Sequence, residues 1–262
     1  MTFATTLAGK IAAWLREQLD ETGARGFVFG LSGGVDSAVV AALCGTASPG
    51  AAVGVILPCH SDPRDESDAQ LVAKRFSLPT LIVRLDGVYD SMVEALDPAS
   101  AWIESRRPLA EGRPAVSDRR LPLANLKPRL RMAALYFVAN NLDSLVVGTG
   151  NRSELSIGYF TKYGDGGADL LPLGQLLKSE VVALARDLGV PEEIIEKPPS
   201  AGLWLGQTDE GEMGFTYAEL ESYLTMGPEA VSPAVAARIG HLARSSRHKR
   251  AVPPAYPRAP DD

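Results

Sequence analysis

The central motif of this chain is Gly30-Leu31-Ser32-Gly33-Gly34-Val35-Asp36-Ser37. It follows an apolar run at residues 26–31, which is typical of a buried strand, and it leads into residues 36–43, which have helical spacing. Paired glycines let the backbone approach a ligand closely, and the two serines add hydroxyl groups. The start of a helix supplies backbone N–H groups and the positive end of the helix dipole. We therefore predict that this loop binds a phosphate or pyrophosphate group.

Asp36 is the unexpected member of the motif, because a carboxylate beside bound phosphates would repel them. A bridging Mg²⁺ removes this conflict if Asp36 is one of its oxygen ligands. The motif lacks the lysine of the Gly-x-x-x-x-Gly-Lys-[Ser/Thr] loop, and its spacing differs from Gly-x-Gly-x-x-Gly. Two glycines alone would also fit a simple strand-to-helix turn capped by Ser32.

On both sides of the motif, apolar runs alternate with segments of helical spacing. Strands separated by helices imply a parallel sheet with right-handed crossovers. We therefore expect an α/β fold, in which one domain spanning residues 1–262 contains an open parallel sheet with helices on both faces. The expected strands are residues 26–31, 52–57, 79–85 and 144–147, and the expected helices are residues 2–22, 36–43, 67–76, 125–140, 218–224 and 233–243.

Composition and charge exclude several classes of protein. The formal net charge of −6 argues against general nucleic-acid binding. No uncharged apolar run approaches the ~18 residues that a membrane helix needs. The N-terminal segment has charged residues at helical spacing among its apolar ones, unlike a signal peptide. Cys44 and Cys59 form no metal-ligand spacing or disulfide framework, so we expect reduced thiols in a cytoplasmic protein without nucleic-acid or membrane partners.

Two segments are expected to be mobile loops. Residues 106–122 hold three prolines, one glycine and five arginines. Residues 197–214 are rich in Gly, Pro and acidic residues, yet they carry Leu203, Trp204 and Leu205. That many apolar side chains in one loop indicate a lid that packs against another surface.

Cys59 and His60 follow the second expected strand and could suggest a nucleophile with its base. Neighbours in an extended segment point apart, and no third orienting group is evident. We do not favour a nucleophilic role for this pair.

The Ser-Gly-Gly-x-Asp-Ser motif resembles the pyrophosphate loop of the N-type ATP pyrophosphatases. Members of that superfamily cleave ATP to AMP and pyrophosphate while they activate an oxygen of a second substrate. Further motifs narrow the resemblance to the NAD synthetase family, over residues 26–254 or so. These motifs are Asn125–Arg129, Gly148–Glu154, Gly158–Asp169, Pro172–Leu173, Lys178, Lys197–Leu203, Gln207–Glu210 and His248–Arg250.

The resemblance implies an adenine nucleotide alpha hydrolase-like, Rossmann-like fold and a ligase that forms a C–N bond. The implied reaction is the final step of NAD biosynthesis, in which ATP drives amidation of deamido-NAD by ammonia through an adenylated intermediate. Its products are NAD, AMP and pyrophosphate. Another ATP pyrophosphatase, such as GMP synthetase or a tRNA-modifying enzyme, is the main alternative. A tRNA enzyme should show a basic face and often redox cysteines. A nucleotide-binding sensor with a dead site would have lost residues such as Asp36, Glu154 or Lys178, and all three are present.

The resemblance also implies site residues. Asp36 and Glu154 match magnesium ligands, although Glu154 alone could be a helix-start acid. Lys178 and Asp169 match catalytic positions, and Lys178 would neutralise the departing pyrophosphate. The ATP-binding positions are Gly30, Leu31, Ser32, Gly33, Gly34, Val35, Asp36, Ser37, Thr149, Lys178 and Ser200. The deamido-NAD-binding positions are Arg129, Lys162, Asp169, His248 and Lys249.

Two expectations concern the nitrogen donor and the assembly. Because the first strand begins near residue 26, the sequence leaves no room before it for the hydrolase domain of glutamine-dependent members, so we expect free ammonia to be the donor. The resemblance further implies a homodimer. Candidate surfaces are the stripe of Leu7, Ile11 and Leu15 and the helix at Met132–Val138, and either could instead belong to the core. No general base stands out.

Overall fold

The computed structural model describes residues 6–106, 120–204 and 206–257. It confirms the expected α/β fold, with a four-stranded parallel sheet of order β3-β2-β1-β4. In chain order the elements are α1 (Leu7–Thr22), β1 (Phe27–Gly30), α2 (Val35–Ala47), β2 (Ala52–Ile56), α3 (Pro63–Arg75), β3 (Thr80–Ile82), α4 (Asp86–Arg106), α5 (Arg120–Ala124), α6 (Leu126–Asn141), β4 (Leu145–Val147), α7 (Arg152–Ile157), α8 (Lys178–Leu188), α9 (Glu192–Ile195), α10 (Asp209–Met213), α11 (Tyr217–Met226), η2 (Pro228–Ala230), α12 (Pro233–Ser245) and η3 (Arg247–Lys249).

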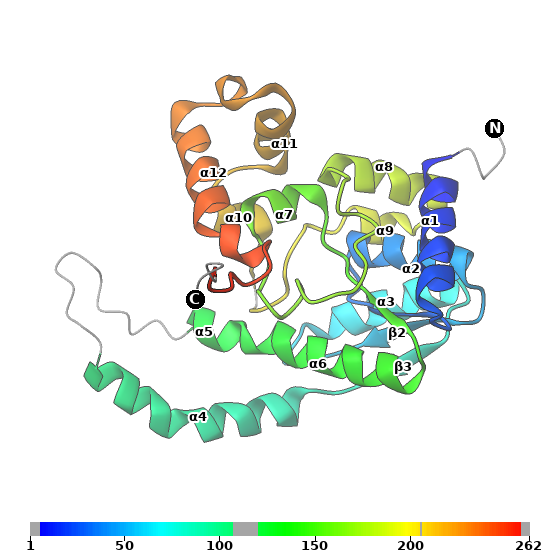
Figure 1. The fold of residues 1–262 in the computed structure, drawn as a ribbon, viewed down its shortest axis with the longest axis horizontal. Helices are drawn as coiled ribbons and strands as arrows, with labels where there is room; N and C mark the ends of the chain where they lie inside the picture. Colours follow the sequence, from blue (N-terminus) through cyan, green and yellow to red (C-terminus); the bar gives the residue numbers. More distant parts are fainter. Residues whose placement is uncertain (1–5, 107–119, 205, 258–262) are drawn as a thin grey trace.

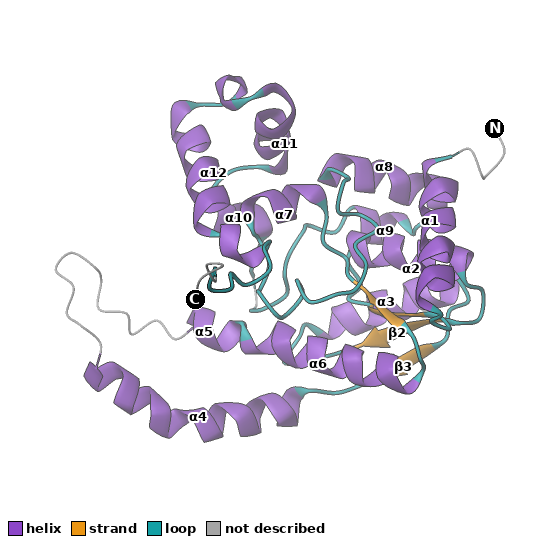
Figure 2. Ribbon diagram, in the orientation of Figure 1, coloured by secondary structure: helices purple, strands orange, loops and turns teal. Residues whose placement is uncertain are grey.

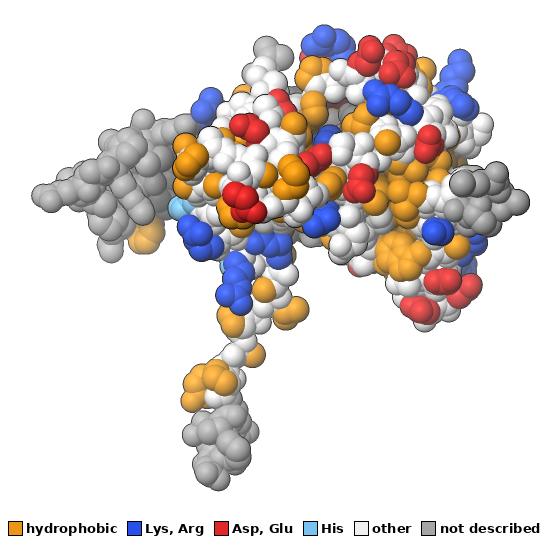
Figure 3. Space-filling model, turned by 90° about the horizontal axis from the view of Figure 1, so that it is seen from above, with side chains coloured by type: hydrophobic (Ala, Val, Ile, Leu, Met, Phe, Trp, Pro, Cys, Tyr) orange, Lys and Arg blue, Asp and Glu red, His pale blue; other side chains and the backbone are white. Residues whose placement is uncertain are grey.

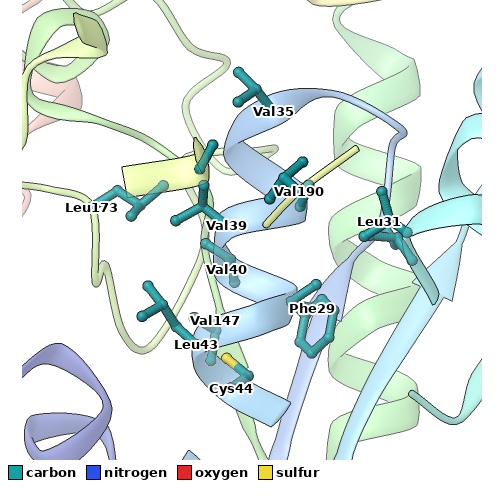
Figure 4. Close-up of a cluster of buried hydrophobic side chains, with 14 of the residues drawn as sticks. Phe29, Leu31, Val35, Val39, Val40, Leu43, Cys44, Val147, Leu173 and Val190 are labelled. Carbon is teal, nitrogen blue, oxygen red and sulfur yellow. The ribbon is translucent and has the colours of Figure 1, made fainter. Parts of the chain in front are cut away.

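Helices cover both faces of the sheet, as expected (Figures 1 and 2). Successive strand residues point to opposite faces, so β1 places Phe29 in one core cluster and Val28 in the other. On the first face α2 packs between the sheet, α1 and α8, and Figure 4 shows Val39, Val40 and Leu43 of α2 in this cluster. On the second face α6 packs on β1 and β4. The all-parallel arrangement brings the carboxyl ends of the strands to one edge.

A small helical layer lies beside that edge. It consists of α7, α10, α11 and α12, whose core includes Ile157, Met213 and Leu220 (Figure 1). On the face seen in Figure 3, acidic and basic side chains are interspersed, in keeping with the modest net charge. None of the helices within the described ranges has the length and apolar character needed to span a bilayer.

Some expected boundaries were wrong. Helix α4 over Asp86–Arg106 was not predicted, because Pro98 interrupts it and its apolar side chains Val88 and Met92 are exposed rather than facing a core. In the expected loop at residues 106–122, Arg120–Ala124 form a helical turn, and residues 107–119 lie outside the described part of the chain. Helix α1 begins at Leu7 because the Thr6 hydroxyl caps it, accepting from the Gly9 amide at 3.1 Å.

Candidate active site

A cavity of about 1670 Å³ opens at the carboxyl edge of the sheet. This is the place where open α/β sheets bind their ligands. Among the predicted site residues, the cavity is lined by Gly30, Leu31, Ser32, Gly34, Val35, Asp36, Ser37, Thr149, Glu154, Lys178, Ser200 and Lys249. The predicted positions that do not line it are Gly33, Arg129, Lys162, Asp169 and His248.

The loop after β1 is held in shape by its own serines. The Ser37 hydroxyl donates to the Gly34 carbonyl at 2.8 Å and accepts from the Ser32 hydroxyl at 3.1 Å. Gly33 adopts a left-handed conformation with φ of +78°, and a Cβ there would lie 2.6 Å from the Cβ of Asp68. No other residue fits this position without moving α3. The loop therefore has the tight, fixed backbone that a phosphate cradle needs.

Asn151 links the two predicted metal ligands, and sequence reasoning missed it. Its side-chain amide donates to Asp36 Oδ1 at 3.0 Å, and its backbone N–H donates to Glu154 Oε2 at 3.2 Å. Its Oδ1 accepts from the Glu154 amide at 3.1 Å and so caps α7. Asn151 is fully buried at 0% exposure. One buried residue therefore orients two carboxylates from distant segments, Asp36 through its side chain and Glu154 through its backbone N–H.

Lys178 lies against the remaining oxygens of these carboxylates. Its ammonium forms an ion pair with Asp36 Oδ2 and lies 4.0 Å from Glu154 Oε1. Burial alone would lower the pKa of Lys178, but the charges of Asp36 and Glu154 raise it overall. Burial, and next the charge of Asp36, raise the pKa of Glu154, and the charge of Lys178 opposes this rise. The Lys178 side chain is only 7% exposed, so it is not a surface lysine of α8.

A layer of tyrosines and acids lies behind Lys178. The Tyr217 hydroxyl donates to Asp209 Oδ2 at 2.8 Å and to Glu154 Oε1 at 3.4 Å. The Tyr159 hydroxyl donates to Glu212 Oε2 at 2.7 Å. Burial raises the pKa of Asp209 and of both tyrosines. Tyr159 and Asp209 fall within motifs of the sequence, but no spacing predicted this layer, because the packing of α7, α10 and α11 brings its members together.

The segment expected to be a lid is attached to the body at two points. At its start, the Lys197 ammonium contacts Asp65 Oδ1 at 2.8 Å and Asp68 Oδ2 at 2.5 Å. Near its middle, the buried Lys127 ammonium donates to the Leu203 carbonyl at 2.8 Å. Trp204 stacks beneath the Arg120 guanidinium, 5.1 Å from the ring centre. The predicted docking residue Leu205 lies outside the described residues.

The five residues predicted to hold deamido-NAD fall into two groups in this chain. Lys162 donates to the His248 carbonyl at 2.7 Å, and Lys249 donates to the Gly158 and Phe160 carbonyls at 2.8 and 2.6 Å. These contacts bring the C-terminal His-Lys pair to the Gly158–Asp169 motif, as the resemblance implies. Asp169 and the exposed Arg129 instead lie at α6.

Asp169 makes its contacts on the far side of β4. Its Oδ2 accepts from the Val146 amide at 2.8 Å, and its Oδ1 accepts from the Tyr136 hydroxyl at 2.9 Å. Both oxygens therefore have a protein donor in this chain, and Asp169 does not line the cavity.

The Cys59–His60 pair has no arrangement for nucleophilic chemistry. Cys59 is fully buried, and burial raises the pKa of its thiol, which disfavours the thiolate. The His60 ring turns to α4, with Nε2 at 2.7 Å from Asp90 Oδ1.

Fold and cavity together define an α/β protein with a parallel sheet and a large ligand cavity at the carboxyl edge of that sheet. The family model described as NAD synthase matches residues 7–253, and the chain belongs to that family. This match does not favour GMP synthetase or a tRNA-modifying enzyme.

Individual relatives agree with the family assignment. A protein of Carboxydothermus hydrogenoformans named NH(3)-dependent NAD(+) synthetase is 50% identical over 93% of this chain and 94% of its own length. The structure titled NMN synthetase from Francisella tularensis has a TM-score of 0.83 and 36% identity, and the match covers 95% of this chain and 97% of that one. The structure of the NH3-dependent NAD synthetase from Campylobacter jejuni has a TM-score of 0.75 and 26% identity. That match covers 96% of this chain and 98% of the other.

Proposed function

We propose that this chain is a ligase that uses ATP to amidate deamido-NAD with ammonia, giving NAD, AMP and pyrophosphate. The observation that carries the proposal is one cavity that joins the phosphate loop, the carboxylates held by Asn151 and the buried Lys178. Membership of the NAD synthase family and a 50% identical relative named for this reaction support the same conclusion.

Each part of the cavity has a role in this chemistry. The nicotinate carboxylate attacks the α-phosphate of ATP, and ammonia then displaces AMP from the mixed anhydride. The backbone of residues 30–37 cradles the phosphates, and Lys178 balances the charge of the leaving pyrophosphate. The lid that Lys127 holds through the Leu203 carbonyl keeps water from the anhydride. Positioning and fixed charge do most of the work.

The residues at this site fit a magnesium ion. Asp36 Oδ2 and Glu154 Oε1 already share one cation, the Lys178 ammonium, and hard carboxylate oxygens are what Mg²⁺ prefers. The described residues offer no cluster of three or more His, Cys, Asp or Glu around a common point, so phosphate oxygens of ATP would complete the shell. When bound, Mg²⁺ would supply charge neutralisation at the phosphates.

We also infer a homodimer that uses the exposed face of α6. Phe137 on this helix is 71% exposed, and α4, which contacts α6, exposes Val88 and Met92. The stripe on α1 is less suited, because Leu15 is fully buried in the core. The α6 face also carries Arg129, and Asp169 contacts it, so both residues would be available to a second copy. The two free thiols support a cytoplasmic location.

A nicotinate mononucleotide substrate is the second candidate. The similarity to the structure titled NMN synthetase, at a TM-score of 0.83, is the observation that favours it. Deamido-NAD carries an AMP unit that nicotinate mononucleotide lacks, and the two substrates are otherwise alike. Comparing kcat/KM for the two substrates therefore separates the candidates.

Product analysis tests the proposed reaction directly. The purified chain is incubated with ATP, Mg²⁺ and deamido-NAD, with either ammonium or glutamine as donor. We expect NAD and AMP in equal amounts, with ammonium far more effective than glutamine. Equal or better turnover with glutamine would overturn the ammonia assignment, and absence of AMP would overturn the ATP pyrophosphatase chemistry.

A further inference from the structure

Each carboxylate of the proposed metal site has one oxygen committed to Asn151 and the other directed at Lys178. For Asp36, Oδ1 accepts from Asn151 and Oδ2 pairs with the ammonium. For Glu154, Oε2 accepts from the Asn151 backbone, while Oε1 lies 4.0 Å from the same ammonium. The two oxygens left for a cation therefore face one place, and the Lys178 ammonium lies at it.

Lys178 is held there at both ends of its side chain. Its backbone N–H donates to the Ser153 hydroxyl at 3.1 Å, which ties the start of α8 to α7. Its ammonium lies 5.4 Å from the centre of the Tyr217 ring. The four-carbon stem between these points has rotatable bonds, so the ammonium can leave the carboxylates while the backbone stays fixed.

An ammonium and a divalent cation cannot both lie against the same two oxygens. Like charges a few ångströms apart repel strongly in a partly buried site, where the side chains are only 7 to 17% exposed. Displacement of the ammonium would leave a buried positive charge without a partner, which is costly. The phosphates of ATP in the same cavity would give it a new anionic partner.

We propose that Lys178 is the resident counter-ion of this carboxylate pair and excludes divalent cations until ATP phosphates draw its ammonium away. Divalent metal then enters the protein site with the nucleotide and not before it. This inference rests on the proposed function, because it takes Asp36 and Glu154 as the metal ligands. It assigns Lys178 two successive partners, the carboxylates and then the phosphates.

Mn²⁺ binding without nucleotide tests the proposal, since the electron paramagnetic resonance signal of free Mn²⁺ reports binding without any turnover. We expect weak binding by the wild-type protein and at least about tenfold tighter binding by Lys178→Met, as removal of one neighbouring positive charge predicts. Adding Asp36→Asn to Lys178→Met should abolish the gain. Lys178→Gln serves as a second variant if the methionine variant unfolds, and thermal unfolding checks both.

Lys74→Met is the matched control, because it removes one ammonium from the exposed face of α3, where Lys74 does not line the cavity. It should give no gain of comparable size. An equal gain in this control, or wild-type binding as tight as that of Lys178→Met, would overturn the counter-ion role.

A second measurement tests separately whether Asp36 and Glu154 are metal ligands. Wild-type protein with α,β-methylene-ATP should hold Mn²⁺ more tightly than Asp36→Asn with the same analogue. If the two are equal, the ligand assignment under the proposed function is wrong, and the counter-ion role is overturned with it. If they differ but nucleotide-free wild type already binds Mn²⁺ tightly, only the counter-ion role is wrong.

Discussion

The ATP side and the dinucleotide side of this molecule are built differently. On the ATP side, Asp36, Glu154 and Lys178 have side chains that are 7 to 17% exposed, and the fully buried Asn151 cross-links the two carboxylates. On the dinucleotide side, the predicted residues are half-buried or exposed, and the side chains of Lys162, Asp169 and Lys249 bond to backbone groups of their own chain. One half is preorganised, whereas the other is dispersed.

This difference indicates which half a single chain can complete. Preorganised charges at the phosphates cost no reorganisation during the reaction, so they belong in a rigid, buried network. The dispersed residues Arg129 and Asp169 lie at α6, whose Phe137 is the most exposed aromatic residue of that helix. The comparison therefore predicts that ATP-side variants act within one chain and that dinucleotide-side function depends on assembly.

The largest effect is expected from Asp36→Asn. It keeps the shape of the side chain but removes half of the carboxylate pair, so we expect turnover to fall roughly 100- to 1,000-fold. Excess Mg²⁺ should restore part of the loss, and circular dichroism should show an intact fold. Glu154→Gln should behave alike.

The matched control is Glu219→Gln, which changes the exposed capping-box carboxylate of α11 outside the cavity. It should leave turnover near the wild-type value. Near-normal turnover of Asp36→Asn with unchanged magnesium dependence would contradict the metal-ligand assignment and, with it, the preorganised ATP half.

Phe137→Asp tests the dispersed half. A charge in the centre of an apolar interface should weaken self-association by roughly 30-fold or more, the equivalent of about 2 kcal/mol. We expect light scattering to show monomers and activity to become dependent on protein concentration. Met226→Asp, at an apolar position on α11 that is 62% exposed, should change neither property. A fully active monomer would show that one chain completes the dinucleotide site.

Local signals explain what the sequence predicted well. The turn from β1 to α2 and the four strands carry their patterns within a few residues. Asn151 with Glu154 three positions later is itself a capping-box pattern and could have been found. Its bond to Asp36, however, spans 115 residues and exists only because β1 and β4 are adjacent. The place of Asp169 likewise depends on a contact with Tyr136 of α6 that no spacing reveals.

Lys127→Met tests how the lid is joined to the preorganised half. Loss of a charged hydrogen bond to the Leu203 carbonyl should lower kcat/KM by about tenfold. Trp204→Ala should lower kcat/KM as well, with little loss of stability.

Hydrogen exchange at residues 197–204 and 206–214 should slow when ATP and deamido-NAD bind, and less so in Lys127→Met. Unchanged exchange in the wild type would count against a lid, and Lys74→Met on the exposed face of α3 provides the control.

The smallest expected effect is on stability, and it concerns the buried acid behind the ATP side. Burial raises the pKa of Asp209 above its ordinary value of 3.8, although hydrogen bonds from Tyr217 and Tyr159 and the charge of Lys178 oppose the shift. A raised folded-state pKa contributes stability that is fully present below the unfolded-state pKa and is lost as pH rises through the folded-state pKa.

Asp209→Asn cannot titrate, so its deficit in free energy of unfolding relative to the wild type should be largest near pH 4 and should shrink toward pH 7. Urea unfolding of both proteins across this range measures the difference. Parallel curves of the free energy of unfolding against pH would mean that the pKa of Asp209 is the same in the folded and unfolded chains. The ATP side would then lack the raised pKa of a buried acid that distinguishes it from the dinucleotide side.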